Sequence, residues 1–234
     1  MIHLFALLSL LLCGICYTGF QNSSHFHNTS NRRSLLLLVF GGALLLRLLL
    51  AYTTHGFSND IACFAAWADR IFTLGPGQFY SAEMFTDYPP GFMYVLYLIG
   101  ALRSLLQIPY YSDLHILLLK SPAILCDIAC GFLLYREAVK RLHFSDLQGI
   151  FAASAYLFQP AVILNSSCWG QVDSVYTLMI ILMCLFLMKG NLLPAYAVYG
   201  LGVLLKPQML IFTPVLLAGI WDHVFLQDFS WRKF

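Results

Sequence analysis

Long apolar runs separated by short polar segments dominate the hydrophobic and polar pattern of this chain. A helix needs about 20 apolar residues to cross a bilayer. Backbone polar groups in lipid must be satisfied within the segment itself, which favours helices over other structures. The pattern therefore predicts an all-α, polytopic transmembrane helical bundle. The candidate membrane segments are 2–20, 35–54, 90–107, 114–135, 148–165, 173–188, 191–205 and 208–221.

Composition strengthens the membrane prediction. Hydrophobic residues make up 60% of the chain and charged residues 10%, whereas soluble domains are typically about half apolar and about a quarter charged. The small net charge of +2 shows no nucleic-acid-binding signature, so no nucleic-acid partner is expected. Cys13 and Cys16 have a CxxC spacing without a second pair, and packing explains them more simply than a metal or redox site.

Two regions are expected along the chain. Residues 1–34 form an N-terminal hydrophobic segment with a polar linker, and residues 35–234 form the transmembrane domain. The stretch 1–20 has no Lys or Arg before its apolar core and no clean small-residue cleavage site. A membrane span is therefore favoured there over a cleaved signal peptide, which is the alternative.

Lys and Arg in short loops predict which side of the membrane is cytoplasmic. Basic residues cluster before the span 35–54 and after the span 114–135: Arg32, Arg33, Arg136, Lys140 and Arg141. Both clusters are cytoplasmic only if one segment between them does not cross. We expect 90–107 to stay on the outer side as an interfacial or re-entrant helix, because it begins at a Pro-Pro-Gly turn and contains Arg103.

Residues 56 to about 113 then form one large outer-face loop with short interfacial helices. The loop is acidic, with the basic residues Arg70 and Arg103 against Asp60, Asp69, Glu83, Asp87 and Asp113. Counting the successive membrane crossings after the cytoplasmic cluster at 136–141 also places the segments 165–173 and 206–208 on the outer face. Three polar motifs thus converge on one side, as an active site at a membrane surface requires.

The first polar motif, "SNDIACFAAWADRIF", has helical periodicity. One stripe recurs at intervals of three and four residues: Asp60, Phe64, Trp67 and Ile71. Ser58 and Asn59 are candidate N-cap residues, which puts Asp60 in the first turn, where the helix dipole favours an acid. Capping alone is the structural alternative for Asp60. Asp69 and Arg70 point away from the stripe, and we interpret them as solvated or interfacial charges.

The next motifs hold further candidate residues. Asp87 and Tyr88 precede a rigid Pro-Pro turn, where they either shape a pocket or simply end a loop. Trp169 suits headgroup depth in the interface. Gln171 and Asp173 lie at the start of a span, and an ionisable residue beside a span indicates function.

Charged side chains within or beside the other spans also need an explanation. Lys206, in "LLKPQ" with Gln208, suits a phosphate, and snorkelling is the structural alternative. Asp127 lies deep in a span, and both Lys120, seven residues earlier, and Arg47 are candidate partners. We interpret these last three residues as structural or as lining a donor cavity.

Four motifs resemble, in the same order, those of the GT-C membrane glycosyltransferases: "NDIACFAAWADRI", "DYPPG" leading into "FMYVLYLIG", "PAVILNSSCWGQVDS" and "LLKPQMLIFTPVLL". The most similar groups are bacterial mannosyltransferases related to the second GPI mannosyltransferase and the dolichyl-phosphate-glucose-dependent glucosyltransferases. The resemblance covers about residues 35–221. It implies that Asp60 is the catalytic base and that outer-loop helices lie on the membrane. Members usually continue for several more spans, so we expect this chain to be a truncated GT-C-like domain.

The resemblance implies an inverting glycosyltransferase that moves mannose or glucose from a polyprenyl-phosphate donor to an acceptor hydroxyl of a glycan or lipid. Asp60 would accept the proton of that hydroxyl on the non-cytoplasmic face. Lys206 and Arg103 would stabilise the departing phosphate, and Asp87 and Tyr88 would shape the pocket. Further substrate contacts are expected from Trp169, Gln171, Asp173 and Gln208.

No cofactor or metal site is required by any motif, although a divalent cation would suit the acidic loop. The expected location is a bacterial cell membrane, or the endoplasmic reticulum membrane in a eukaryote. A transporter or lipid flippase is the main alternative, although such proteins place charges near the midplane and often carry repeats. A non-catalytic membrane scaffold is the third hypothesis. No short motif specifies the sugar, the acceptor or the linkage.

Overall fold

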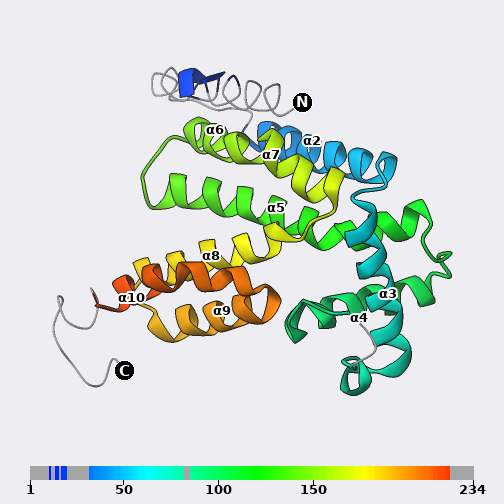
Figure 1. Cartoon of the computed structure of the whole chain (residues 1–234). Helices are drawn as coiled ribbons and strands as arrows, with labels where there is room; N and C mark the ends of the chain where they lie inside the picture. The colour runs from blue at the N-terminus through cyan, green and yellow to red at the C-terminus, as the bar shows by residue number, and fades with distance from the viewer. Residues whose placement is uncertain (1–10, 12–13, 16, 20–31, 82–84, 222–234) are drawn as a thin grey trace. The chain divides into compact units, whose positions relative to one another are not determined.

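The computed structural model describes residues 11, 14–15, 17–19, 32–81 and 85–221. Within this described part every regular element is a helix and no strand occurs (Figure 1), so the all-α prediction is confirmed. Glu83 of the acidic loop, the tail from Asp222 and most of the predicted span 2–20 lie outside the described residues.

The helices from Arg32 onward match most of the predicted segments. In chain order they are α2 Arg32–Thr53, α3 Ser58–Leu74, η1 Pro76–Gln78, α4 Pro90–Leu105, α5 Asp113–Lys140, α6 Asp146–Leu157, α7 Pro160–Ile163, η2 Leu164–Trp169, α8 Asp173–Met188, α9 Leu192–Leu205, η3 Pro207–Phe212 and α10 Thr213–Trp221. The elements η1 and η3 are 3₁₀-helices, whereas η2 is a π-helix.

Two described helices are long and apolar enough to cross a membrane. These are α2 with 22 residues and α5 with 28 residues. The segments α6 and Pro160–Trp169 count as a third span if the 50° bend between them is accepted. The helices α4, α8 and α9, and the stretch Pro207–Trp221, are apolar but shorter. The described part is thus compatible with a membrane protein that has two or three spanning helices.

Proline shapes two of the segments that were predicted as spans. The predicted span 148–165 is broken: α6 ends at Leu157 and a second helix begins at Pro160, with a bend of 50° between them. Proline has no N–H to donate and forces the preceding residue out of helical geometry, and Gln159 accordingly has φ −62° and ψ 119°. The predicted segment 208–221 corresponds to the continuous apolar helix Pro207–Trp221, which begins as the 3₁₀-helix η3 and continues as α10, with Pro214 in the first turn of α10.

Contacts divide the chain into two compact units, each of which combines two stretches of sequence. Unit 1 contains Met1–Ala65 and Ile108–Ser174, and unit 2 contains Ala66–Gln107 and Val175–Phe234. The division therefore falls within α3 and near the start of α8.

In unit 1, α2 and α5 run antiparallel and pack together with α6. At one end, Arg32 Nε donates to the hydroxyl of Tyr135 at 3.1 Å and lies 3.2 Å from Asp146 Oδ1. At the other end, Lys120 of α5 donates to the carbonyl of Thr54, just after α2, at 2.7 Å. The two basic clusters used to predict orientation therefore lie at the same end of unit 1.

This arrangement bears on α4, which lies between α2 and α5 in the chain. The segment 54–112 leaves and re-enters unit 1 at one end, so it crosses a membrane either not at all or an even number of times. A helix of 16 residues is about 24 Å long, which is shorter than the hydrocarbon core of about 30 Å. The length of α4 supports the expectation that it does not cross, and the even count allows α4 to cross only if another part of this segment also crosses.

Unit 2 contains α4, most of α3, and the helices from α8 to α10. Its core joins α8, α9, η3 and α10 through buried apolar side chains: Met183, Leu187, Ala195, Met209, Leu216 and Ile220. The helix α4 packs against α9.

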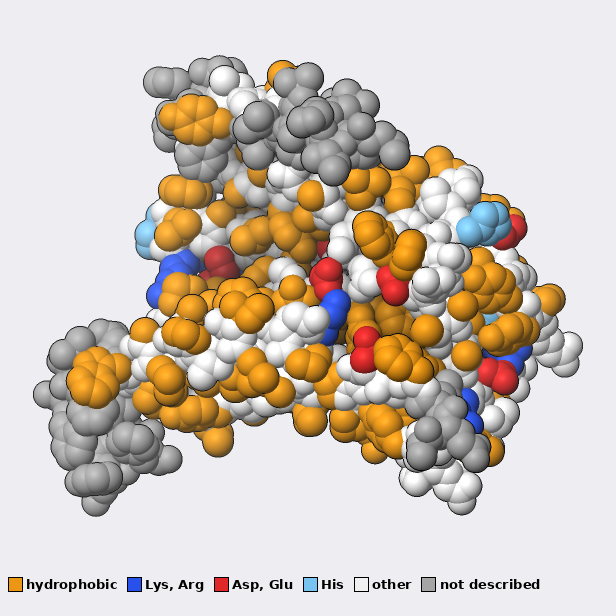
Figure 2. Space-filling view, in the orientation of Figure 1, with side chains coloured by type: hydrophobic (Ala, Val, Ile, Leu, Met, Phe, Trp, Pro, Cys, Tyr) orange, Lys and Arg blue, Asp and Glu red, His pale blue; other side chains and the backbone are white. Residues whose placement is uncertain are grey.

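Hydrophobic side chains cover much of the visible surface of the described helices (Figure 2). On α2 alone, four leucines are well exposed: Leu37, Leu38, Leu45 and Leu49. An exposed apolar stripe on a helix that is long enough to span a bilayer suits contact with lipid.

Candidate functional site

The candidate base Asp60 lies in the first turn of α3, as predicted. The helix begins at Ser58, and the N–H of Ile61 donates to the carbonyl of Phe57 at 3.1 Å. Phe57 thus occupies the N-cap position, and the prediction of Ser58 or Asn59 as the cap is wrong. The reason is a contact distant in sequence, since the N–H of Phe57 is held by the carbonyl of Trp169 at 2.9 Å.

Two side chains donate hydrogen bonds to the same oxygen of Asp60. The indole N–H of Trp169 donates to Oδ2 at 3.0 Å, and the amide of Gln171 donates to the same atom. The other oxygen, Oδ1, accepts no hydrogen bond from the residues that the structure describes. The carboxylate is therefore oriented through one oxygen, while its second oxygen is available to a substrate.

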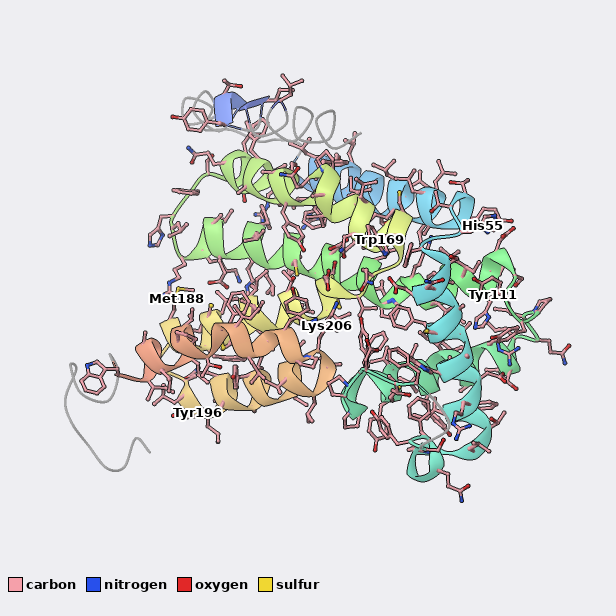
Figure 3. The ribbon with its side chains drawn as sticks, in the orientation of Figure 1. His55, Tyr111, Trp169, Met188, Tyr196 and Lys206 are labelled. Atoms are coloured by element: carbon pink, nitrogen blue, oxygen red, sulfur yellow. The ribbon has the colours of Figure 1, made fainter. Side chains whose placement is uncertain are left out.

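The chain segments that carry these groups are joined directly. Besides the backbone hydrogen bond, the rings of Phe57 and Trp169 lie 5.4 Å apart. Gly56 has a φ of +79°, and a Cβ there would come within 2.7 Å of the carbonyl of Trp169. Figure 3 shows Trp169 at the end of the π-helix and His55 on the loop that leads from α2 to α3. The structure thus brings the opening loop and the motif "SSCWGQVDS" together within unit 1, and their location on the outer face stays a prediction.

The π-helix Leu164–Trp169 shapes the second motif. Gly170 ends it in the left-handed region with φ 90°, and the N–H groups of Gly170 and Gln171 both donate to the carbonyl of Asn165, at 3.1 and 2.9 Å. The side-chain amide of Asn165 donates to Asp173 Oδ2 at 2.9 Å. Segments of π-helix are rare and occur frequently at functional sites.

A buried charge pair lies in the helices that support this end of unit 1. Arg47 Nε donates to Asp127 Oδ2 at 3.1 Å, and both side chains have 0% exposure. The hydroxyls of Ser166 and Ser174 also donate to Asp127, at 2.6 and 2.5 Å, and that of Tyr156 at 3.2 Å. The prediction that Arg47 is a partner of Asp127 is confirmed.

In unit 2, Lys206 lies where α9 meets η3, as its Lys-Pro sequence predicted. Its side chain is largely buried, and its ammonium lies 5.7 Å from the ring centres of both Tyr88 and Tyr176. The ring of Tyr88 also lies 5.7 Å from that of Trp67 and 5.5 Å from that of Phe92. Figure 3 shows Lys206 at the end of α9. Aromatic faces stabilise a cation in such a position.

Arg103 of α4 forms an ion pair with Asp69 of α3. The interpretation of Asp69 as only a solvated charge is therefore wrong, because the fold of unit 2 brings Arg103 to its carboxylate. Its neighbour Arg70 is also bonded within unit 2, donating to the carbonyl of Phe79 at 3.0 Å. A substrate contact by Arg103 stays a prediction.

The remaining predicted residues of unit 2 lie near its surface. Asp87 and Gln208 are exposed. The hydroxyl of Tyr80 donates to the carbonyl of Tyr88 at 3.0 Å. Partial burial, with a smaller contribution from Tyr94, raises the pKa of Tyr80, so this hydroxyl stays protonated as a donor at neutral pH. This hydrogen bond from Tyr80 thus holds the backbone of the "DYPPG" motif at Tyr88.

Two polar side chains of the candidate site were not predicted. Asn165 precedes Asp173 by eight residues within the same polar motif, and that polar context was the available signal. Tyr176 follows Asp173 by three residues, a spacing that places both on one helical face. Each could have been found by extending the motif by one helical turn.

Comparisons with protein-family models, with curated proteins and with solved structures found no match. Within the described ranges, no three His, Cys, Asp or Glu side chains gather in a way that could hold a metal ion. The geometry of Asp60 and its donors is therefore the structural feature from which a function is inferred.

Proposed function

We propose that this chain is an integral-membrane glycosyltransferase. It moves a hexose, mannose or glucose, from a polyprenyl-phosphate donor to an acceptor hydroxyl of a glycan or lipid on the non-cytoplasmic face. The arrangement of Asp60 carries the proposal, because one carboxylate oxygen is held by two N–H donors and the other is open. The resemblance of the four sequence motifs to the GT-C glycosyltransferases supports the same reaction class.

The chemistry assigned to Asp60 is general-base catalysis. As the acceptor oxygen attacks the anomeric carbon, its proton passes to Asp60 Oδ1. The bond from that carbon to the phosphate oxygen breaks, the phosphate leaves as an anion, and the configuration inverts. Trp169 and Gln171 keep the carboxylate in one orientation throughout. Base catalysis of this kind contributes about 10²–10⁴-fold to a rate.

Unit 2 contains a cation that is suited to bind a phosphate. Lys206 is 8% exposed, and its ammonium lies over two tyrosine rings at the junction of α9 and η3. Arg103 is the weaker candidate, since Asp69 already neutralises its charge. We therefore assign phosphate binding to Lys206.

A transporter would be expected to use ionisable groups inside its spans, and Arg47 and Asp127 are such groups. Asp127, however, accepts hydrogen bonds from four described side chains, which is the pattern of a fixed structural contact. Asp60, by contrast, has an open carboxylate oxygen and lies in the first turn of its helix. This difference favours transfer chemistry over transport.

The proposal is tested with the full chain reconstituted in liposomes. Polyprenyl phosphates that carry labelled mannose or labelled glucose serve as donors, a total glycolipid extract serves as acceptor, and nucleotide sugars serve as control donors. We expect labelled glycolipid from a polyprenyl-phosphate donor and none from a nucleotide sugar. Movement of the labelled donor between leaflets without any product would support the flippase hypothesis instead.

A further inference from the structure

Lys120 of α5 is a buried cation whose described partners are all oxygens of neutral groups. Its side chain has 0% exposure. The ammonium donates to the carbonyls of Thr54 at 2.7 Å, Ser167 at 2.9 Å and Ala51 at 3.3 Å, and it lies 3.2 Å from the hydroxyl of Thr54. The carbonyl of Cys168 is more distant at 3.5 Å. Lys120 is therefore not the partner of Asp127, which was one of the two predicted pairings.

These oxygens come from two helix ends. Ala51 lies in the last turn of α2, Thr54 follows that helix, and Ser167 and Cys168 lie in the π-helix. The last carbonyls of a helix lack intrahelical partners and carry the negative end of its dipole. One ammonium thus satisfies carbonyls of both ends and holds the two ends together.

The candidate base and its donors follow directly from these two ends. Asp60 comes six residues after Thr54, and Trp169 and Gln171 come two and four residues after Ser167. The side chain of Lys120 also passes close to the turn between them, since a Cβ on Gly170 would lie 3.3 Å from Lys120 Cε. A change at Lys120 would therefore move the donors relative to the carboxylate.

The helix that carries Lys120 is continuous despite Pro122. Proline leaves the carbonyl four residues earlier, that of Leu118, without its usual donor. The hydroxyl of Ser121 donates to this carbonyl at 2.7 Å instead. Asp127, two turns further along α5, holds Ser166 and Ser174 on either side of the same motif. The helix α5 thus holds the motif "SSCWGQVDS" at Ser166 and Ser174 through Asp127, and at Ser167 through Lys120.

We propose that Lys120 is a positioning residue: its ammonium joins the end of α2 to the π-helix so that Trp169 and Gln171 hydrogen-bond to Asp60. Burial of a charge within a membrane span is costly, and a methionine of similar length would fill the same space without that cost. The contribution of the ammonium is therefore the geometry that it imposes on carbonyl oxygens. Its effect on catalysis rests on the proposed function, whereas its effect on the Trp169–Asp60 hydrogen bond does not.

Tryptophan indole signals test the hydrogen bond without any activity. The full chain has four tryptophans, so ¹⁵N-tryptophan protein in detergent gives few indole signals, and Trp169→Phe identifies the relevant one. We expect Asp60→Asn to shift this signal and Lys120→Met to shift it in the same direction, whereas the matched variant Lys140→Met, at the other end of α5, leaves it in place. An unshifted Trp169 signal in folded Lys120→Met protein would overturn the proposal.

A double-mutant cycle on the transfer rate separates positioning from general stability. If Lys120 acts through Asp60, Lys120→Met slows transfer at least 10-fold in the wild type and has little further effect in Asp60→Asn. Equal slowing in both backgrounds would mean a merely structural role and would overturn the proposal. If Lys120→Met does not fold, Thr54→Val is compared in the same way, because it removes the hydroxyl beside the ammonium. An unshifted Trp169 signal in Thr54→Val would then overturn the proposal. Absence of transfer by the wild type refutes the proposed function alone, since the indole signal still reports on Lys120.

Discussion

At the residue scale, the buried charges of unit 1 are held by many partners. Asp127 receives hydrogen bonds from four side chains on α2, on α6, in the π-helix and at the start of α8. Arg47 reaches Asp127 through Nε and donates through Nη1 to the carbonyl of Ala43 at 3.3 Å. Removing one partner from such a pair leaves an uncompensated buried charge.

Arg47→Met should therefore destabilise the protein strongly. The expected loss is about 3–5 kcal/mol, the usual cost of breaking a buried pair from one side. The change is measured as the shift of the unfolding midpoint in detergent against the exposed control Lys140→Met, which we expect to stay within about 0.5 kcal/mol of the wild type. A small effect of Arg47→Met would show that the pair contributes little to the stability of unit 1.

Some residue contacts could be predicted from sequence and others could not. That Asp127 has a basic partner was predictable, because a charge deep in an apolar span requires an opposite charge, whereas the choice between Arg47 and Lys120 was not. The contact between Asp60 and Trp169 joins positions 109 residues apart, so local spacing could not reveal it. The surroundings of Lys120 left no signal either, since backbone carbonyls are present at every position.

At the element scale, helix ends set by local chemistry were predictable. The helix α3 ends where Gly75 adopts φ +81°, and α4 begins at Pro90 after an extended Pro89. The π-helix was not predictable, because its geometry depends on hydrogen bonds to distant segments, including that between Trp169 and Phe57. The break before Pro160 carried a local signal, the Gln-Pro sequence, that the hydrophobic pattern concealed.

The junction between α2 and α3 depends on Gly56. Gly56→Ala should destabilise by at least about 1–2 kcal/mol, because the left-handed conformation disfavours a side chain and the new Cβ would meet the carbonyl of Trp169 at 2.7 Å. Gly41→Ala in α2 is the control, since among the described residues nothing outside the adjacent turns of α2 lies within 4 Å of the position that its Cβ would take, and alanine favours helix. Unfolding midpoints in detergent compare the two, and equal stability of both variants would contradict the tight contact.

At the scale of the whole molecule, the proposed function requires Asp60 to lie on the non-cytoplasmic side of the membrane. The antiparallel packing of α2 and α5 puts the basic clusters at one end of unit 1 and Asp60 with its donors at the other. The sidedness follows from this arrangement together with the placement of basic loops in the cytoplasm.

Sided labelling in a cysteine-free background tests this arrangement. Single cysteines at 60, 87 and 206 should react with an impermeant maleimide from the outer side, and a cysteine at 140 only from the cytoplasmic side. A cysteine at 106 should label on the same side as one at 87, since α4 is expected not to cross. Labelling of 87 and 106 from opposite sides would show that α4 spans the membrane.

The initial rate of hexose transfer by Asp60→Asn protein is the decisive test of whether Asp60 is the catalytic base. The comparison uses wild type and Asp113→Asn at equal amounts of folded protein. Asp113 is a suitable control because it is an exposed acid of the same unit, 3.6 Å from His55. We predict that Asp60→Asn slows transfer about 10²–10⁴-fold, while Asp113→Asn transfers near the wild-type rate. Transfer by Asp60→Asn at near the wild-type rate would contradict the assignment of Asp60 as the base.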